Sequence, residues 1–292
     1  MSVGTASVPT MRYGFVGSFG TVAEQVALAR EVEAAGWDGY FTWDAISLGT
    51  DATWDPFALL GAVAASTERI TLGALVFAVP RRSPWELARQ ALTVDHLSGG
   101  RLVLPMGVGV TEDRAVAGVS GRGATPHGLR ERAALLDETL AILDAAAGGE
   151  PFSHAGEHYQ VQDMLIAPRP VARPRVPIWP VGVWPAPKSM ARAARWDGIV
   201  VQLRGERAME EPTPDDVAAL VAHLTEVRGG PEAMAGFEVV LQGQFAEQPD
   251  AAERAAAYEA AGATWWIDGR WQGPDAQPDR QRALVASGPP RT

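Results

Sequence analysis

The most restrictive feature of the sequence is a regular alternation of two patterns along its whole length. Short apolar runs typical of buried strands are each followed by a segment whose apolar residues have helical spacing. The expected strands are 12–17, 38–43, 70–79, 101–110, 176–182, 197–203, 236–245 and 263–268, and the expected helices are 21–36, 55–67, 83–100, 129–149, 187–196, 213–230, 250–262 and 278–288. Such alternation predicts an α/β fold in which crossover helices connect parallel strands.

Two observations favour a closed barrel over an open sheet. The turn after the first expected strand reads GFVGSFG, so it lacks the G-x-G-x-x-G pattern of open dinucleotide-binding sheets. The strands are continuously apolar, as parallel strands covered on both faces should be. We therefore expect a single (β/α)8 TIM barrel over residues 1–292, with a small hairpin in residues 150–177 between the fourth helix and the fifth strand.

Charge and composition exclude several classes of function. The formal net charge of −10 disfavours nucleic acid and anionic membrane surfaces as partners. Without cysteine, the chain has no disulfides, zinc–thiolate sites or thiol catalysis. No run of about 20 apolar residues is present, and the first residues lack a signal-peptide pattern. We expect a cytoplasmic protein that acts on a small molecule.

In a barrel of this type the active site lies at the carboxyl ends of the strands. The positions that the expected boundaries place there include Phe19, Trp43, Asp44, Leu75, Val76, Phe77, Met106, Gly107, Gly109, Gly182, Val183, Trp184, Gln202, Gln242, Gln244, Asp268 and Arg270. This rim is aromatic and apolar, with few ionisable groups. It suits a planar ring system better than a sugar or a metal-bound polyacid.

Asp44 and His127 are the candidate acid–base groups. Asp44 ends the second strand and could act as a general base or accept a hydrogen bond from a ring N–H; equally, it could pair with a nearby arginine at the barrel lip. His127 precedes the fourth helix at the mouth side, where an active-site role and a surface role both stay open. No His-x-His pattern occurs at a strand end, so we predict no metal site.

Lys188 is the only lysine among 25 basic side chains. A Schiff-base lyase would need this amine on a strand that points into the barrel, whereas Lys188 lies at least five residues beyond the expected strand end. It instead falls in the first turn of a helix, where the backbone N–H groups and a cation both favour a phosphate. A solvated surface lysine is the alternative.

Three segments carry a resemblance to a known family. REVEAAGWDGYFTWDAI, ITLGALVFAVPRRSPWELARQALTVDHLSGGRLVL and PRVPIWPVGVWPAPKSMARAARWDGIV resemble the bacterial-luciferase-like flavin-dependent oxidoreductases. The most specific piece runs from Pro80 to Leu102. The resemblance implies a TIM barrel that binds FMN or the deazaflavin F420 at its carboxyl-terminal mouth, and it implies a homodimer formed through the second and third helices.

The resemblance also implies roles for individual positions. The isoalloxazine ring would rest over a bulge at the end of the third strand, with a non-proline cis peptide at Leu75–Val76. The phosphate would lie near 107–109 and 182–189, which adds Lys188 and Ser189 to the cofactor site. The remaining candidate walls for the ring and the substrate are Phe19, Trp43, Trp54, Phe77, Met106, Trp184 and Gln202.

Two departures from the family pattern affect the expected function. Relatives commonly carry Asp-His after the second strand, where this chain reads WDAI with Ala45, and Pro105 and Met106 interrupt the fourth strand. We expect a monooxygenase that uses reduced FMN, supplied by a separate reductase, and O2 on a small apolar or aromatic substrate. The alternatives are F420-dependent hydride transfer, with Asp44 or His127 as acid–base group, and a non-enzymatic or cofactor-poor flavin-binding protein.

Overall fold

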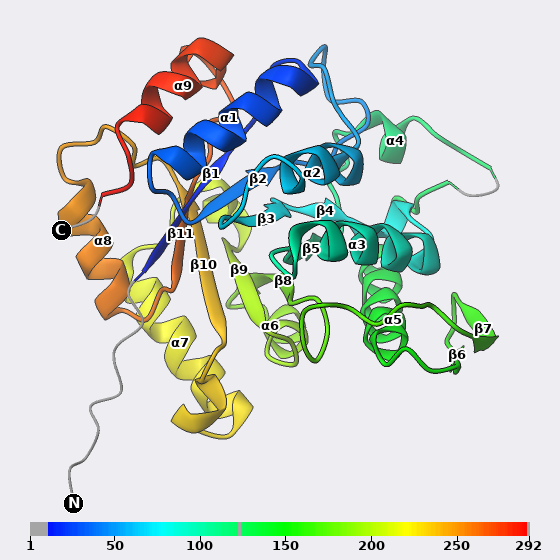
Figure 1. Cartoon of the computed structure of the whole chain (residues 1–292). Coiled ribbons are helices and arrows are strands. Elements are labelled where there is room, and N and C mark those ends of the chain that lie inside the picture. The colour runs from blue at the N-terminus through cyan, green and yellow to red at the C-terminus, as the bar shows by residue number, and fades with distance from the viewer. Residues whose placement is uncertain (1–10, 122–123, 291–292) are drawn as a thin grey trace, which may run out of the picture.

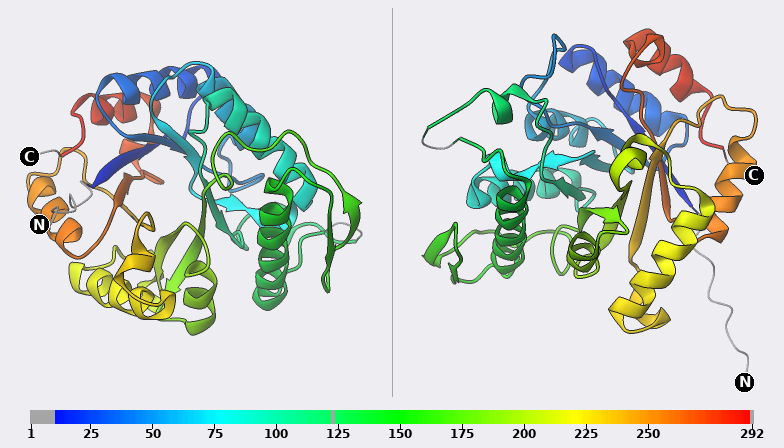
Figure 2. Two further views of the ribbon diagram at one scale, coloured as in Figure 1. Left: turned by 60° about the horizontal axis from the view of Figure 1, so that its bottom comes forward. Right: turned by 180° about the vertical axis from the view of Figure 1, so that it is seen from behind.

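The computed structural model describes residues 11–121 and 124–290. Nine parallel strands form one sheet in the order β3-β2-β1-β11-β10-β9-β8-β5-β4, and helices cover the outside of this ring of strands (Figures 1 and 2). The strands are β1 (Arg12–Val16), β2 (Gly39–Thr42), β3 (Thr71–Ala74), β4 (Phe77–Ala78), β5 (Leu104–Gly107), β8 (Ile178–Trp184), β9 (Gly198–Leu203), β10 (Glu238–Gly243) and β11 (Trp265–Asp268).

The predicted parallel barrel is confirmed, and the third expected strand closes it. This strand is divided into β3 and β4, of which β3 pairs with β2 and β4 pairs with β5. A parallel bridge between Leu72 and Leu102 brings the two ends of the sheet together. The peptide bond at the division, Leu75–Val76, is cis, as the family resemblance implied.

The helices follow the strands with the end signals that the sequence predicts. The helices are α1 (Val22–Ala34), α2 (Pro56–Ala64), α3 (Pro84–Ser98), α4 (Arg114–Ala117), α5 (Leu129–Ala147), α6 (Pro187–Ala193), α7 (Pro214–Arg228), α8 (Ala251–Ala260) and α9 (Pro278–Ala286). Thr21 and Glu24 form a capping box on α1. The short α4 was not predicted; the Asp113 side chain caps it by accepting from the Ala115 N–H. Among the described residues, no helix has the length and hydropathy needed to cross a bilayer.

Aromatic side chains fill part of the barrel interior. Phe41, Trp179 and Trp265 are at most 2% exposed and contact one another, with ring centroids 5.8–6.5 Å apart. Glycines make the room for these rings: a Cβ at Gly14 would lie 2.7 Å from the Phe41 ring. The interior is packed around these rings, and we expect a ligand at the carboxyl ends of the strands, as in other barrels of this type.

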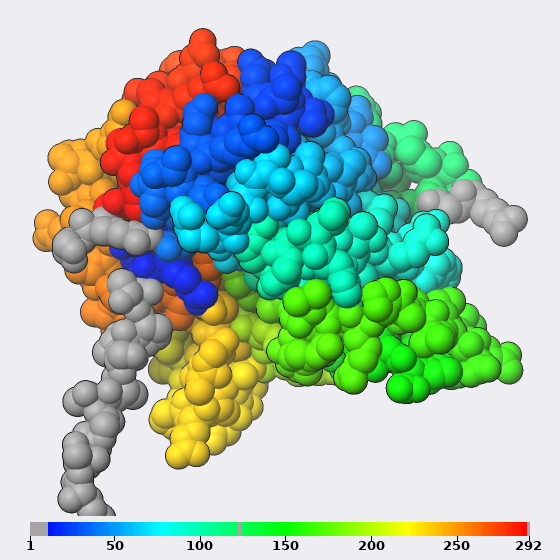
Figure 3. Space-filling view, in the orientation of Figure 1, coloured from blue at the N-terminus to red at the C-terminus, as the bar shows by residue number. Residues whose placement is uncertain are grey.

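The segment between α5 and β8 carries a small antiparallel pair, β6 (Phe152–Ala155) and β7 (Gln160–Met164). Glu138 of α5 anchors its turn by accepting hydrogen bonds from the N–H groups of Glu157, His158 and Tyr159 at 2.8–3.0 Å. The Tyr159 ring meets Trp85 of α3 edge to face, with centroids 6.0 Å apart. The green segment that includes this pair forms one corner of the molecular surface (Figure 3).

Replacing Glu138 by glutamine should weaken this anchor in a pH-dependent way. Burial by itself would raise the pKa of Glu138, but the backbone N–H donors and His154 outweigh it and hold that pKa below its usual value. A lowered pKa stabilises the fold above the unfolded-state value of about 4.3, and this stability is lost as the pH falls through the folded-state value. We expect Glu138→Gln to cost about 2 kcal/mol at pH 7.

Urea unfolding at pH 7 and at pH 3.5 measures this effect. The gap between Glu138→Gln and the wild type should shrink at the lower pH, because the wild-type carboxylate then becomes protonated as well. Glu157→Gln is the matched control, since the Glu157 side chain is exposed in the same turn. A gap of the same size at both pH values would contradict the assigned role of the charge.

Candidate active site

The strand period fixes which side chains face the mouth of the barrel. Successive residues of a strand point to opposite faces, and Phe41, Val200, Val240 and Ile267 belong to the interior cluster. The residues two positions further along these strands therefore face inward, nearer the opening. These residues are Trp43, Gln202, Gln242 and Gly269.

Three aromatic rings form one wall of the mouth. Trp43 lies between Phe19 and Trp271, with ring centroids 5.6 Å and 6.3 Å away and edge-to-face orientations. The Trp43 indole N–H donates to the backbone carbonyl of Ser18, which fixes the ring against the loop after β1. The structure thus brings two predicted wall residues together and adds Trp271, which the sequence reasoning had not selected.

The bulge between β3 and β4 lies beside this wall, because β3 pairs with β2 and the Leu75 N–H donates to the Thr42 carbonyl at 2.8 Å. Leu75 is 7% exposed and belongs to the interior cluster, and Val76 packs against that cluster. A Cβ at Gly107 would lie 2.8 Å from Val76 Cγ2, so only glycine allows this contact. Gly109 has φ +73° and ends the strand region with a left-handed turn. The predicted bulge and its glycine neighbours therefore occur together.

Two predicted wall residues lie on the other face of their strands. Phe77 and Met106 are both fully buried in the layer between the barrel and the helices. Phe77 stacks on Phe57 of α2 at a centroid distance of 4.7 Å. The apolar strands gave no sign of which face was inward, and the structure does not bring these two side chains to the mouth.

At the end of β8, the predicted site residues also point to two different faces of the strand. A Cβ at Gly182 would lie 2.1 Å from Ile199 Cδ1, so this position faces the helix layer. Trp184 faces the same way, and its ring lies 5.5 Å from His223 of α7. Val183 has the opposite, inward orientation. Trp184 and Gly182 are therefore not brought to the mouth, whereas Val183 is.

The first turn of α6 holds two residues of the predicted phosphate site, Lys188 and Ser189. The Ser189 hydroxyl accepts from the Val183 N–H at 3.0 Å and donates to the Val181 carbonyl at 3.3 Å, so it already ties the helix to the strand. Lys188 is exposed at the start of this helix. Its ammonium is open to solvent at the start of the helix.

Asp44 is buried within a network of charged groups at the lip of the barrel. Its carboxylate is 1% exposed and accepts from the Ala78 N–H at 2.9 Å and from the guanidinium groups of Arg81 and Arg82. Arg81 also contacts Asp113 at 2.8 Å. Of the two roles left open for Asp44, this arrangement favours the ion pair that holds the lip.

Asp113 extends this network to the loop after β2. Its carboxylate accepts from the N–H groups of Ile46 and Ser47, both at 3.0 Å. Burial would raise the pKa of Asp113, but these backbone donors, together with Ala115 and Arg81, outweigh it and hold the pKa below its usual value. The loops after β2, β4 and β5 are thus joined by one chain of charges.

A pocket of about 260 Å³ lies beside this network. Its lining includes Ala45, where relatives were expected to carry an imidazole, and Trp54, a predicted substrate residue. The Trp54 indole N–H donates to the Gly20 carbonyl at 2.8 Å, and the ring is 42% exposed. The residues that line the pocket are Asp44, Ala45, Ile46, Thr53, Trp54, Asp55, Pro56, Arg81 and Arg82.

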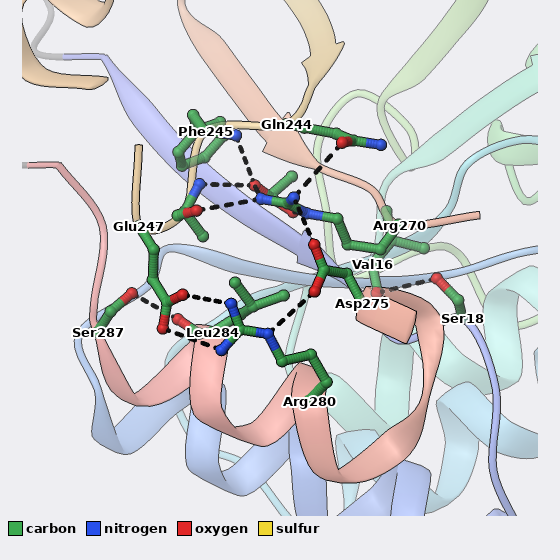
Figure 4. A network of polar contacts seen from close by, with 12 residues as sticks. Val16, Ser18, Gln244, Phe245, Glu247, Arg270, Asp275, Arg280, Leu284 and Ser287 are labelled. Carbon is green, nitrogen blue, oxygen red and sulfur yellow. Dashed lines mark hydrogen bonds and ion pairs between the residues drawn. The ribbon is translucent and has the colours of Figure 1, made fainter. Parts of the chain in front are cut away.

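A second buried ion pair holds the loops after β10 and β11. Asp268 is 0% exposed and accepts from Arg270 Nε at 2.7 Å and from the N–H groups of Phe245 and Ala246 at 2.8 Å. Arg270 continues toward Gln244 and Asp275 (Figure 4). These contacts fix the backbone that precedes Trp271.

His127 and Gln202 are the remaining predicted site residues. His127 is exposed, and it lies on the chain just before α5. Gln202 faces the mouth from β9 and is also exposed. Among the described residues, no cluster of three or more His, Cys, Asp or Glu side chains could hold a metal ion.

Comparison with known proteins identifies the family. A family model described as luciferase-like monooxygenase matches residues 3–289. The chain belongs to the luciferase-like monooxygenase family. Members of this family are oxidoreductases.

Relatives within the luciferase-like family differ in cofactor. An F420-dependent glucose-6-phosphate dehydrogenase from Beutenbergia cavernae is 34% identical over 169 residues, which cover 55% of this chain and 48% of that protein. The F420-dependent tetrahydromethanopterin reductase from Methanopyrus kandleri has a similar structure, with a TM-score of 0.73 at 15% identity over 95% of this chain and 96% of that one. The oxygenating constituent of 3,6-diketocamphane monooxygenase from Pseudomonas putida, solved with FMN, has a TM-score of 0.60 at 17% identity over 79% and 66%.

The matches to curated sequences are partial. The chain spans 36–54% of the length of three curated relatives that it matches. The structural matches, at 15% and 17% identity, show the fold alone.

Proposed function

We propose that this chain is an oxidoreductase that binds reduced FMN in the barrel mouth and oxygenates a small apolar or aromatic substrate. The observation that carries the proposal is the Leu75–Val76 bulge, which packs on Gly107 and lies next to the end of β2, where the wall around Trp43 begins. A bound flavin supplies the redox chemistry, since no protein side chain here can do so. F420-dependent hydride transfer is the second candidate, because relatives with this cofactor share the fold.

The residues present fit a planar ring. Val76 packs directly on the backbone of Gly107, Gln242 and Trp271 lie against Gly269, and aromatic rings fill the barrel interior. In the proposal, Leu75 and Val76 support the ring, while Phe19 and Trp43 beside them exclude water from it. Lys188, at the start of α6, would neutralise the phosphate near 107–109.

The charged groups have supporting roles in this proposal. Asp44 is saturated by Arg81, Arg82 and the Ala78 N–H, so it holds the lip and does not move protons. His127 is the remaining candidate for proton transfer, and it would have to turn toward the mouth to act. A homodimer and a separate flavin reductase belong to the proposal as well.

Titration of the purified protein with FMN, reduced FMN and F420, followed by absorbance and fluorescence, tests the proposal. Binding of reduced FMN together with reductase-coupled O2 uptake supports the monooxygenase; F420 binding with hydride transfer supports the second candidate. Tight flavin binding without turnover would indicate the non-enzymatic alternative. If none of these cofactors binds, the proposed function is wrong.

Gly107→Val should weaken cofactor binding by about tenfold or more, equivalent to at least about 1.4 kcal/mol. The new side chain would meet Val76 Cγ2 and Val181 Cγ2, which lie 2.8 Å and 3.3 Å from a Cβ, and would displace the bulge. Gly128→Ala is the control, because a Cβ there meets nothing within 4 Å. Equal cofactor affinity in the folded Gly107→Val protein would remove the bulge from the site.

A further inference from the structure

We propose that Trp271 and Gln242 form a pair of hydrogen-bond donors that binds a neutral carbonyl oxygen in the barrel mouth. Both side chains face the opening, one from the loop after β11 and the other from β10. This inference deepens the proposed function, on which it rests for the use of the mouth as a ligand site. It assigns a hydrogen-bonding role to Trp271 of the aromatic wall and to Gln242, which lies outside the wall and the bulge.

The two donor nitrogens both lie close to Gly269. A Cβ at this glycine would lie 3.1 Å from Gln242 Nε2 and 3.1 Å from Trp271 Nε1. Any side chain at position 269 would therefore stand against both donors. The two nitrogens therefore lie on the same side of Gly269 and at most about 6 Å apart, which is close enough for one oxygen between them to accept from both.

Neither donor is used within the described part of the chain. The indole N–H groups of Trp37, Trp43 and Trp54 donate to backbone carbonyls, whereas those of Trp179 and Trp265 are enclosed in the packed interior. Trp271 Nε1 and the Gln242 amide have no hydrogen-bond partner among the described residues, and both residues are half-buried. Because their nitrogens are reachable from solvent, a ligand acceptor can approach them and replace water there.

The local charges favour a neutral acceptor over an anion. Arg270, between Gly269 and Trp271, points to the opposite face, where Asp268 and Asp275 neutralise it. It therefore adds no positive charge to the donor pair. The Trp271 ring meets Trp43 edge to face, so an apolar or aromatic body would lie beside the carbonyl. The chemistry recognised is that of a ketone, aldehyde, amide or ring dione.

Such a carbonyl has two sources. The flavin and deazaflavin rings carry carbonyl oxygens on their pyrimidine edge, and a substrate can carry one of its own. The experiment therefore has two arms, both using Trp271→Phe, which keeps the ring and loses the N–H, and Gln242→Met, which keeps the length and loses the amide. Trp85→Phe and Gln248→Met are the matched controls; these residues lie on α3 and in the exposed loop after β10.

The first arm measures the dissociation constants of FMN and F420 by fluorescence titration. The second compares acetophenone with ethylbenzene, which lacks the carbonyl, in the presence and absence of cofactor. Loss of one neutral hydrogen bond of about 1 kcal/mol corresponds to about fivefold in affinity, so we expect about fivefold weakening for each variant in one of the arms.

Each outcome decides a specific point. Weaker cofactor binding in the variants assigns the pair to the cofactor ring, whereas an unchanged cofactor affinity with a lost preference for acetophenone assigns it to the substrate. Unchanged values in both arms, or a wild type that shows no preference for acetophenone and no effect of the variants on cofactor binding, overturn the proposal. If the wild type binds no cofactor, the proposed function is wrong. The comparison of acetophenone with ethylbenzene in the absence of cofactor then still tests the donor pair.

Discussion

Asp268→Ala should lower the free energy of unfolding by about 3–5 kcal/mol, the range for removing one partner of a buried ion pair. The carboxylate is fully buried and accepts from the Arg270 guanidinium and from the N–H groups of Phe245 and Ala246. Alanine would leave the two backbone donors without an acceptor and the buried arginine with only the more distant carboxylate of Asp275, at 3.5 Å. The loops after β10 and β11 would lose their common anchor.

Guanidinium chloride unfolding followed by circular dichroism measures this effect. Asp279→Ala is the control, because this aspartate is exposed in the first turn of α9 and should change stability by less than about 1 kcal/mol. The double variant Asp268→Leu/Arg270→Met should recover part of the loss, since it removes the buried charge as well. A loss below 1 kcal/mol in Asp268→Ala would show that the pair does not anchor the loops.

Asp44→Asn should lower the free energy of unfolding by about 3 kcal/mol. Asparagine keeps the shape of the side chain but removes the charge that faces Arg81 and Arg82, and its NH2 group cannot accept from a guanidinium. The loss of charge should loosen the connection between the loops after β2 and β4. Urea unfolding measures the change, with the exposed Asp51→Asn in the same loop as the control.

The same variant separates the two roles of Asp44. A lip-forming ion pair predicts a large loss of stability, with turnover reduced only as far as the mouth is disturbed. A general base predicts the reverse, a 10²–10⁴-fold loss of turnover at nearly unchanged stability. Unfolding and reductase-coupled turnover, measured on one preparation, distinguish these results. The second pattern would return Asp44 to the catalytic residues.

The order and type of the barrel elements could be predicted from the sequence, because each strand and helix is coded locally. The end signals of α1, α2 and α3 lie within a few residues of each helix start, and the cis peptide at Leu75–Val76 followed from the family resemblance. The short α4 was missed because a single capping aspartate in a loop of small and polar residues gives little pattern.

The orientation of the site residues could be predicted only in part. A strand that is apolar on both faces has no alternation to show which side is inward, so Met106 and Trp184 were selected together with Trp43. The partners of Asp44 lie 37 and 38 residues further along the chain, and only the folded barrel brings them together. Trp271 lies three residues beyond the end of β11, just outside the strand ends that were considered.

The aromatic packing of Phe41, Trp179 and Trp265 has a consequence for the order of ligand exchange. Because these rings fill part of the barrel interior, we expect molecules to enter and leave the mouth at the carboxyl ends of the strands. In the proposed function, a substrate that contacts Phe19 would then cover the ring over Leu75–Val76. We therefore expect ordered binding and release: the cofactor binds before the substrate, and the product dissociates before the used cofactor is exchanged.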